Sequence, residues 1–229
     1  MLHQKPLTEL IFIDLETTSQ YPTYNDIDKP LIRELFYKRF EKEINDTQVF
    51  TNKEADAELK LPAVEQVYNK KAPLFAEFGK IIAISIGKLT ETADGIKLTT
   101  LNLSGDDEKV LLTDFVSKTQ KSICGAKISE MNTIVAYNGL NFDIPYIAKR
   151  LLINGLKLPV TLDIGGLKPC NISWVIDPCD HWAMTSWNNH TSLDLLCAIF
   201  CVESSKTDMS GTDVKDLYWK EKNLKKISE

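Results

Sequence analysis

Two carboxylates follow a short apolar run near the N-terminus, and their spacing points to a metal-binding role. Asp14 and Glu16 lie in the stretch Leu10–Thr18, where four apolar residues precede Asp-x-Glu and two threonines. Residues two apart in an extended strand point to the same side, so we expect the two carboxylates to lie together. Neighbouring carboxylates repel each other and are costly to desolvate, and a divalent cation commonly offsets both costs. The alternative is two solvated acidic residues at a frayed strand end.

Asp143 is a second candidate of the same kind. It lies in the segment Ala136–Tyr146, where a predicted strand delivers Asn138, a tight turn follows, and a helix begins near Asp143. An acidic residue in the first turn of a helix suits the positive end of the helix dipole, and it is also available to a cation. The alternative is a capping aspartate whose neighbour, Phe142, lies in the core.

Taken together, these stretches resemble the first two motifs of the DEDD superfamily of 3'-5' exonucleases. The chain has Asp-x-Glu at the end of its first predicted strand, and Asn-x-x-x-Phe-Asp between a later strand and a helix. The segments Glu77–Ile82 and Ser192–Leu196 also resemble the stand-alone exonucleases related to the proofreading domain of family-B DNA polymerases. The resemblance covers most of the chain, in order.

The resemblance implies an RNase H-like fold and hydrolysis of phosphodiester bonds by a two-metal-ion mechanism. The expected substrate is the 3' end of single-stranded or frayed DNA, and a DNA polymerase or repair protein is an expected partner. Asp14, Glu16 and Asp143 would bind two Mg²⁺ or Mn²⁺ ions and carry catalysis. The residues expected to contact the terminal nucleotide are Thr17, Asn138, Asn141 and Phe142.

The pattern breaks at the C-terminus, where the family has a fourth carboxylate, an aspartate four residues after a tyrosine or histidine. Tyr218 has no aspartate at that spacing. His190 and Asp194 have the spacing but come too early, and Asp194 is expected to be structural. The segment Lys220–Glu229 carries no stop signal, which favours a natural sequence that continues further. The alternative is a protein without full metal coordination, a nucleic-acid-binding module of the same fold.

The elements that must position these residues alternate between strands and helices, with a largely helical excursion over 26–71 between the first two strands. This pattern predicts an α/β fold, a mixed sheet flanked by helices, as one domain over 1–229. The first strand, 10–18, is expected to be buried on both faces. Further strands are predicted at 81–87, 95–103, 132–137 and 159–163. Helices are predicted at 107–118, 142–154, 192–201 and 211–219, and 164–190 is predicted to be mostly loop.

Composition excludes several classes of protein. The 229 residues are 43% hydrophobic and 26% charged, which is typical of one globular domain with a substantial core. A formal net charge of -5 argues against binding nucleic acid through bulk charge alone, although metal ions would still neutralise a phosphate. Five cysteines without a C-x-x-C pair favour reduced thiols, and Cys197 and Cys201 are expected to pack in the core. No signal sequence or membrane-length run is present, so a cytoplasmic protein without a membrane partner is expected.

An α/β phosphatase with Asp14 as covalent nucleophile is a third possibility. That chemistry favours a second aspartate two residues later, and Glu16 occupies this position. The sequence therefore disfavours it.

Overall fold

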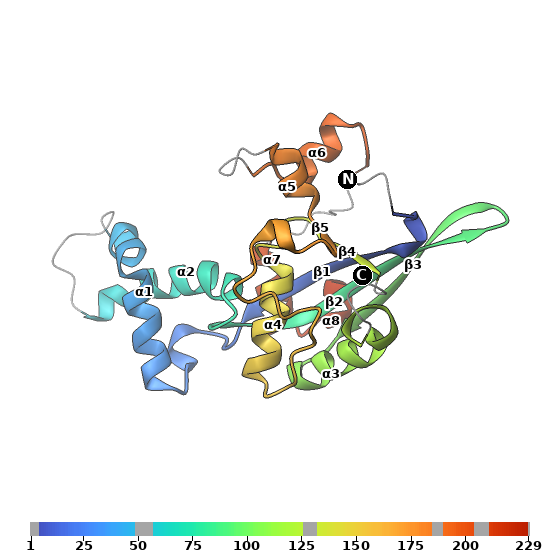
Figure 1. Cartoon of the computed structure of the whole chain (residues 1–229). Coiled ribbons are helices and arrows are strands. Elements are labelled where there is room, and N and C mark those ends of the chain that lie inside the picture. The colour runs from blue at the N-terminus through green and yellow to red at the C-terminus, as the bar shows by residue number, and fades with distance from the viewer. Residues whose placement is uncertain (1–4, 49–56, 126–131, 185–189, 204–210, 229) are drawn as a thin grey trace. The chain divides into compact units, whose positions relative to one another are not determined.

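The computed structural model of the chain describes residues 5–48, 57–125, 132–184, 190–203 and 211–228. The chain divides into two compact units, each built from separate stretches of sequence. Unit 1 comprises 1–16, 81–209 and 224–229, and unit 2 comprises 17–80 and 210–223 (Figure 1). The expectation of a single domain stays a prediction.

A five-stranded mixed sheet has the strand order β3-β2-β1-β4-β5. The strands are β1 (Leu10–Ser19), β2 (Gly79–Thr92), β3 (Gly95–Ser104), β4 (Thr133–Val135) and β5 (Val175–Ile176). β1 pairs in parallel with β4, β4 pairs in parallel with β5, and β2 pairs antiparallel with β3. This mixed sheet with helices is the α/β architecture that the sequence predicts, with the first strand at its centre.

β1 is covered on one face only. Ile11, Ile13 and Leu15 are buried, whereas the intervening Phe12 is half-buried and Asp14 is exposed. The prediction of a strand buried on both faces is therefore wrong. Side chains of a strand alternate between its two faces, so Asp14 and Glu16 lie on the face opposite the buried residues and remain accessible.

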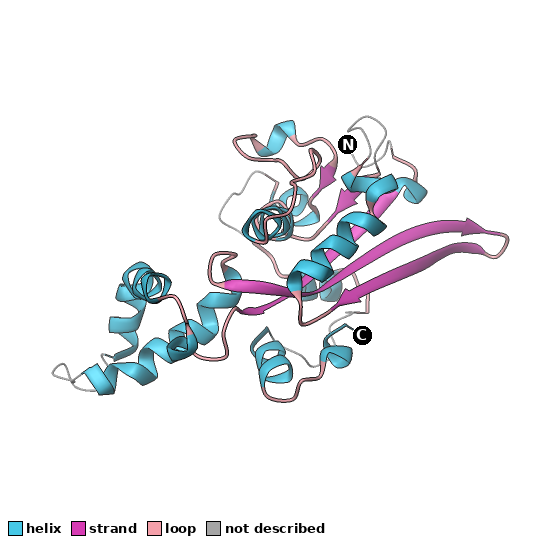
Figure 2. Cartoon of the chain, turned by 90° about the horizontal axis from the view of Figure 1, so that it is seen from below, coloured by secondary structure: helices cyan, strands magenta, loops and turns pink. Residues whose placement is uncertain are grey.

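β2 and β3 form the predicted hairpin. Their register runs without interruption from Ala83 opposite Ser104 to Thr92 opposite Gly95. The hairpin extends as a long two-stranded ribbon, and β3 lies at one edge of the sheet with nearly all of its residues exposed (Figure 2).

The α-helices of unit 1 are α3 (Glu108–Lys118), α4 (Asp143–Ile153), α5 (Pro178–Ala183), α6 (Leu193–Ile199) and α8 (Leu224–Ser228). Of these, α3 and α8 contact the edge strand β3. Ile144, Ile147 and Leu151 recur at helical spacing on α4 and are fully buried. Asp107 caps α3, because its carboxylate accepts the backbone N–H groups of residues 109 and 110.

A buried ion pair joins α3, α4 and β2. The carboxylate of Glu108 accepts hydrogen bonds from Arg150 on α4, through Nε at 2.8 Å and through Nη2. The same carboxylate accepts the backbone N–H of Ile81 at 2.7 Å and Nδ2 of Asn154 at 2.9 Å. Glu108 and Arg150 are both buried. Their bonds fix the helix that begins at Asp143 against the sheet.

Unit 2 has a hydrophobic core of its own. Its helices are α1 (Pro30–Gln48), α2 (Ala57–Lys71) and α7 (Gly211–Trp219), which confirms the helical excursion and the helix predicted at 211–219. Phe36 lies at the centre of the core, and its ring centroid is 4.8 Å from that of Phe40 and 5.2 Å from that of Tyr68.

Three local predictions in the second half of the chain differ from the structure. Residues 159–163 form a turn instead of a strand, because the N–H groups of Leu162 and Asp163 bond back to the carbonyl of Pro159. The last strand of the sheet is β5, which lies with α5 inside the segment predicted as loop. Cys201 is exposed and does not pack in the core, because α6 ends at Ile199 and the chain turns away with a φ of 53° at Cys201.

Among the described residues, no helix is long and apolar enough to cross a membrane.

Candidate active site

The structure brings Asp143 close to Asp14. Asp143 is 4% exposed at the start of α4, and a backbone hydrogen bond connects its carboxylate to Leu15, the neighbour of Asp14 on β1. Burial, and secondly the charge of Asp14, raise the pKa of Asp143 from 3.8 to about 7. These two acidic residues from distant parts of the sequence, one in the middle of β1 and one at the start of α4, therefore form one electrostatic site.

Glu16 lies two residues beyond Asp14 on the same side of β1, and it is half-buried. The three acidic residues proposed from the sequence thus belong to unit 1, two of them on β1 and one in the first turn of α4. Within the described part of the chain, however, no three His, Cys, Asp or Glu side chains are gathered closely enough to form a ready-made metal centre.

The loop between β4 and α4 is held in an unusual conformation. Asn138 has a φ of 57°, in the left-handed region that non-glycine residues enter at a cost. Hydrogen bonds to Asn138 close the loop. The Asn138 carbonyl accepts the N–H groups of Asn141 and Phe142, and the Asn138 Oδ1 accepts a hydrogen bond from Nδ2 of Asn141 at 3.0 Å. The next residue, Gly139, lies so close to Ala136 that a Cβ added to it would be 2.2 Å from the Ala136 Cβ.

This close approach predicts that Gly139→Ala disrupts the loop. We expect it to destabilise the protein by about 1–3 kcal/mol, because neither backbone segment can give way without breaking its hydrogen bonds. Thermal unfolding measures the effect. Gly165→Ala is the matched control, since its Cβ would meet nothing closer than 3.6 Å. Equal melting temperatures for the two variants would contradict the prediction.

Asp177 is a member of this site that the sequence analysis does not identify. It follows β5, is 1% exposed, and its carboxylate accepts the backbone N–H groups of Asn138 at 2.8 Å and Leu140 at 3.1 Å. The available signal is the order Val-Ile-Asp-Pro, in which two β-branched residues precede an N-cap residue and a proline at the first helical position. This order lies within residues 164–190, whose Gly, Pro and Trp content favours a loop prediction for the whole segment.

The residues expected to contact a nucleotide have the following environments. Asn141 is exposed and Phe142 is half-buried, with the Phe142 ring 5.3 Å from that of Tyr146. Thr17 follows Glu16 on β1, and its hydroxyl donates to the carbonyl of Pro73 at 3.0 Å. Their role in substrate binding stays a prediction.

The residues that the late part of the sequence offers for the fourth carboxylate have the following environments. His190 precedes α6, and its Nδ1 lies 3.4 Å from Sγ of Cys179, so it does not share a helix face with Asp194. Asp194 is half-buried in the first turn of α6. Asp216 is exposed on α7 and pairs with Lys220. Asp208 and the side chain of Asp213 lie outside the described residues.

The raised pKa of Asp143 predicts a stability that falls as pH rises in metal-free solution. The folded protein keeps the Asp143 proton up to about pH 7, whereas the unfolded chain releases it near pH 3.8. The unfolded state therefore binds fewer protons between these values, and folding loses on the order of 4 kcal/mol across this window. Melting temperatures in EDTA from pH 4.5 to 8 should show this decline, and Asp143→Asn should remove it. Asp114→Asn, at an exposed position of α3, should leave it unchanged; a decline that persists in Asp143→Asn contradicts the assignment.

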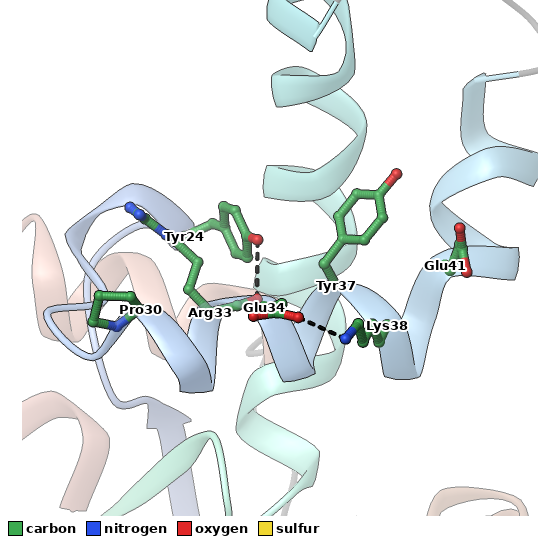
Figure 3. Close-up of a pocket in the computed structure, with 7 residues that line it drawn as sticks. All are labelled: Tyr24, Pro30, Arg33, Glu34, Tyr37, Lys38 and Glu41. Atoms are coloured by element: carbon green, nitrogen blue, oxygen red, sulfur yellow. Dashed lines mark hydrogen bonds and ion pairs between the residues drawn. The ribbon is translucent and has the colours of Figure 1, made fainter.

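Unit 2 carries a separate open pocket of about 490 Å³ (Figure 3). Its charged residues are of both signs, and Lys38 pairs with Glu34. The Tyr24 hydroxyl donates to the carbonyl of Arg33 at 3.0 Å. None of the predicted site residues lines this pocket, which is formed by Tyr24, Pro30, Arg33, Glu34, Tyr37, Lys38 and Glu41.

Comparison with known proteins adds one finding. Residues 74–229, more than half of the chain, match the family described as predicted 3'-5' exonucleases related to the exonuclease domain of PolB. The matched part includes Asp143 and Asp177 but begins after Asp14 and Glu16. No curated protein matches the chain.

Proposed function

The chain belongs to the family of predicted 3'-5' exonucleases related to the exonuclease domain of PolB, and we propose that it releases nucleotides from the 3' end of single-stranded or frayed DNA. A nuclease domain implies a nucleic-acid substrate. The choice of DNA, the 3' polarity and the use of divalent metal ions in this chain are parts of the proposal.

The observation that carries the proposal is the position of Asp14 beside the buried Asp143. Burial and the neighbouring negative charge both oppose ionisation of Asp143, and its raised pKa of about 7 expresses that cost. A nearby cation would remove the cost, and carboxylate oxygens are the ligands that Mg²⁺ and Mn²⁺ prefer. The donor chemistry therefore fits a divalent ion.

Asp14 and Asp143, with Glu16 on the same side of β1, are the residues that would hold the metal. Bound Mg²⁺ or Mn²⁺ would supply Lewis acidity to the attacking water and to the departing 3' oxygen. The exposed amide of Asn141 would orient the terminal sugar, and the half-buried ring of Phe142 offers a face on which a base can stack. Asn138 and Thr17 complete the proposed contacts with the nucleotide.

Release of nucleotides from a 5'-labelled single-stranded DNA in the presence of Mn²⁺ tests the proposal. We expect a ladder that shortens from the 3' end and that disappears in EDTA. Asp14→Ala should abolish the ladder, which excludes a contaminating nuclease. A ladder that persists in Asp14→Ala would refute the assignment of the site.

A second candidate function is a nucleic-acid-binding module of the same fold. It is favoured because, among the described residues, no three His, Cys, Asp or Glu side chains are gathered closely enough to form a ready-made metal centre. Binding of labelled single-stranded DNA without any shortening in Mn²⁺ or Mg²⁺ would support this candidate over the enzyme.

A further inference from the structure

Asp177 is a buried carboxylate whose oxygens are occupied by backbone N–H groups. Oδ1 accepts the N–H of Asn138 at 2.8 Å and that of Cys179 at 3.0 Å, and Oδ2 accepts the N–H of Leu140 at 3.1 Å. A buried carboxylate is costly unless hydrogen bonds replace its hydration, and these three bonds do so. Two of them reach across from β5 to the loop that follows β4.

The loop requires such a partner. Asn138 adopts the left-handed conformation, which asparagine tolerates better than most residues, and the N–H groups of Asn138 and Leu140 donate to Asp177. Without a buried acceptor, both N–H groups would lack a hydrogen bond away from water. Asp177 thus offsets the cost of the conformation that leads into Asp143.

The connection through the sheet is short. β4 and β5 pair in parallel, with Val135 opposite Ile176, so Asp177 follows the strand that lies beside the start of the loop. Asp177 also caps α5 through the N–H of Cys179. One side chain therefore fixes the end of β5, the start of α5 and the loop before Asp143.

We propose that Asp177 is a positioning residue of the nuclease site, which holds the loop 138–142 so that Asp143 faces Asp14. The inference rests on the proposed function for its effect on turnover, although the hydrogen bonds themselves do not depend on it. Asp177 acts through the loop, because its oxygens are already committed to three backbone donors.

Asp177→Asn is the most selective test. Asparagine is as good an N-cap as aspartate, so α5 keeps its cap. Its amide group, however, places two donors where Oδ2 now accepts the N–H of Leu140, and that bond is lost. The matched control is Asp180→Asn, which removes the same charge from the first turn of the same helix, where no loop amide bonds to it among the contacts described.

We expect Asp177→Asn to lower kcat for nucleotide release by about 10- to 100-fold, as does the loss of other groups that orient metal ligands. KM for single-stranded DNA should also rise, because Asn141 and Phe142, the proposed contacts with the substrate, belong to the loop that loosens. Asp180→Asn should behave like the unaltered protein in both constants. An unchanged kcat in Asp177→Asn, with an active unaltered protein, would overturn the proposal.

Hydrogen exchange tests the loop independently of activity. The amides of residues 138–142 should exchange faster in Asp177→Asn, while those of β2 keep their protection. Asp177→Ser is the second variant, to be used if Asp177→Asn does not fold. A serine at this position can still cap α5 but cannot reach the loop, so the same pattern of exchange is expected. Unchanged exchange in the loop, or equal acceleration throughout the chain, would overturn the positioning role. The unaltered protein could release no nucleotides while the amides of residues 138–142 still exchange faster in Asp177→Asn. In that case the proposed function fails, but the role of Asp177 in holding the loop is supported.

Discussion

Asp143→Asn is expected to lower the rate of nucleotide release by about 10³-fold, since the loss of several kcal/mol of metal-dependent stabilisation corresponds to that factor. Asparagine has nearly the same shape as aspartate, but it offers one neutral oxygen to a cation where the carboxylate offers two charged ones. The loss should appear in kcat at saturating DNA and should not be rescued by raising the DNA concentration.

The same substitution should leave the folded protein at least as stable as before at pH 8 in EDTA. The neutral amide removes the desolvation of a 4% exposed carboxylate and its repulsion by Asp14, which together raise the pKa of Asp143 to about 7. A gain or no change in melting temperature, combined with the loss of activity, separates a catalytic role from a structural one. Asp114→Asn is the control, and unaltered cleavage by Asp143→Asn would remove Asp143 from the site.

Arg150→Ala is expected to destabilise the protein by about 3–5 kcal/mol, because it leaves the buried carboxylate of Glu108 without its charged partner. The ion pair lies in the interior, where the hydrogen bonds to Ile81 and Asn154 remain but do not neutralise the charge. Urea unfolding measures the loss as a lower midpoint with an unchanged slope.

Two further variants sharpen this test. Lys149→Ala removes a neighbouring charge from the exposed side of α4 and should change stability by less than about 0.5 kcal/mol. The double variant Glu108→Gln with Arg150→Met replaces both charges and should recover much of the loss. A midpoint for Arg150→Ala equal to that of Lys149→Ala would show that the ion pair contributes nothing.

Local signals predicted much of unit 1. The alternation over Gly95–Leu103 next to an apolar run predicts the β2–β3 hairpin. Ser192, and either Asp106 or Asp107, precede helical apolar patterns as candidate caps, and the structure places Ser192 and Asp107 at the two N-caps. The joint role of Asp14 and Asp143 was implied by the resemblance to the DEDD exonucleases, and in the structure β1 pairs in parallel with β4, the strand that leads toward Asp143.

The remaining features depend on contacts that no local pattern contains. β5 has only two residues, and its place in the sheet is set by its neighbour β4. Asp177 is important because of two amides almost forty residues away, in a loop whose left-handed turn is visible only in three dimensions. The accessible face of β1 could not be predicted from Leu10–Ile13, because four successive apolar residues show no alternation between apolar and polar positions. Only Asp14 and Glu16, further along the strand, indicate which face is accessible.

The aromatic core of unit 2 has a consequence for how the sequence can diverge. Phe36, Phe40 and Tyr68 pack against one another, and the Phe36 and Phe40 rings also contact Phe78 and Phe75, which lie between α2 and the end of the loop before β2. The family match begins at residue 74, so it contains Phe75 and Phe78 but neither α1 nor α2. Substitutions in α1 and α2 must therefore keep an apolar surface that fits these two residues of the matched part.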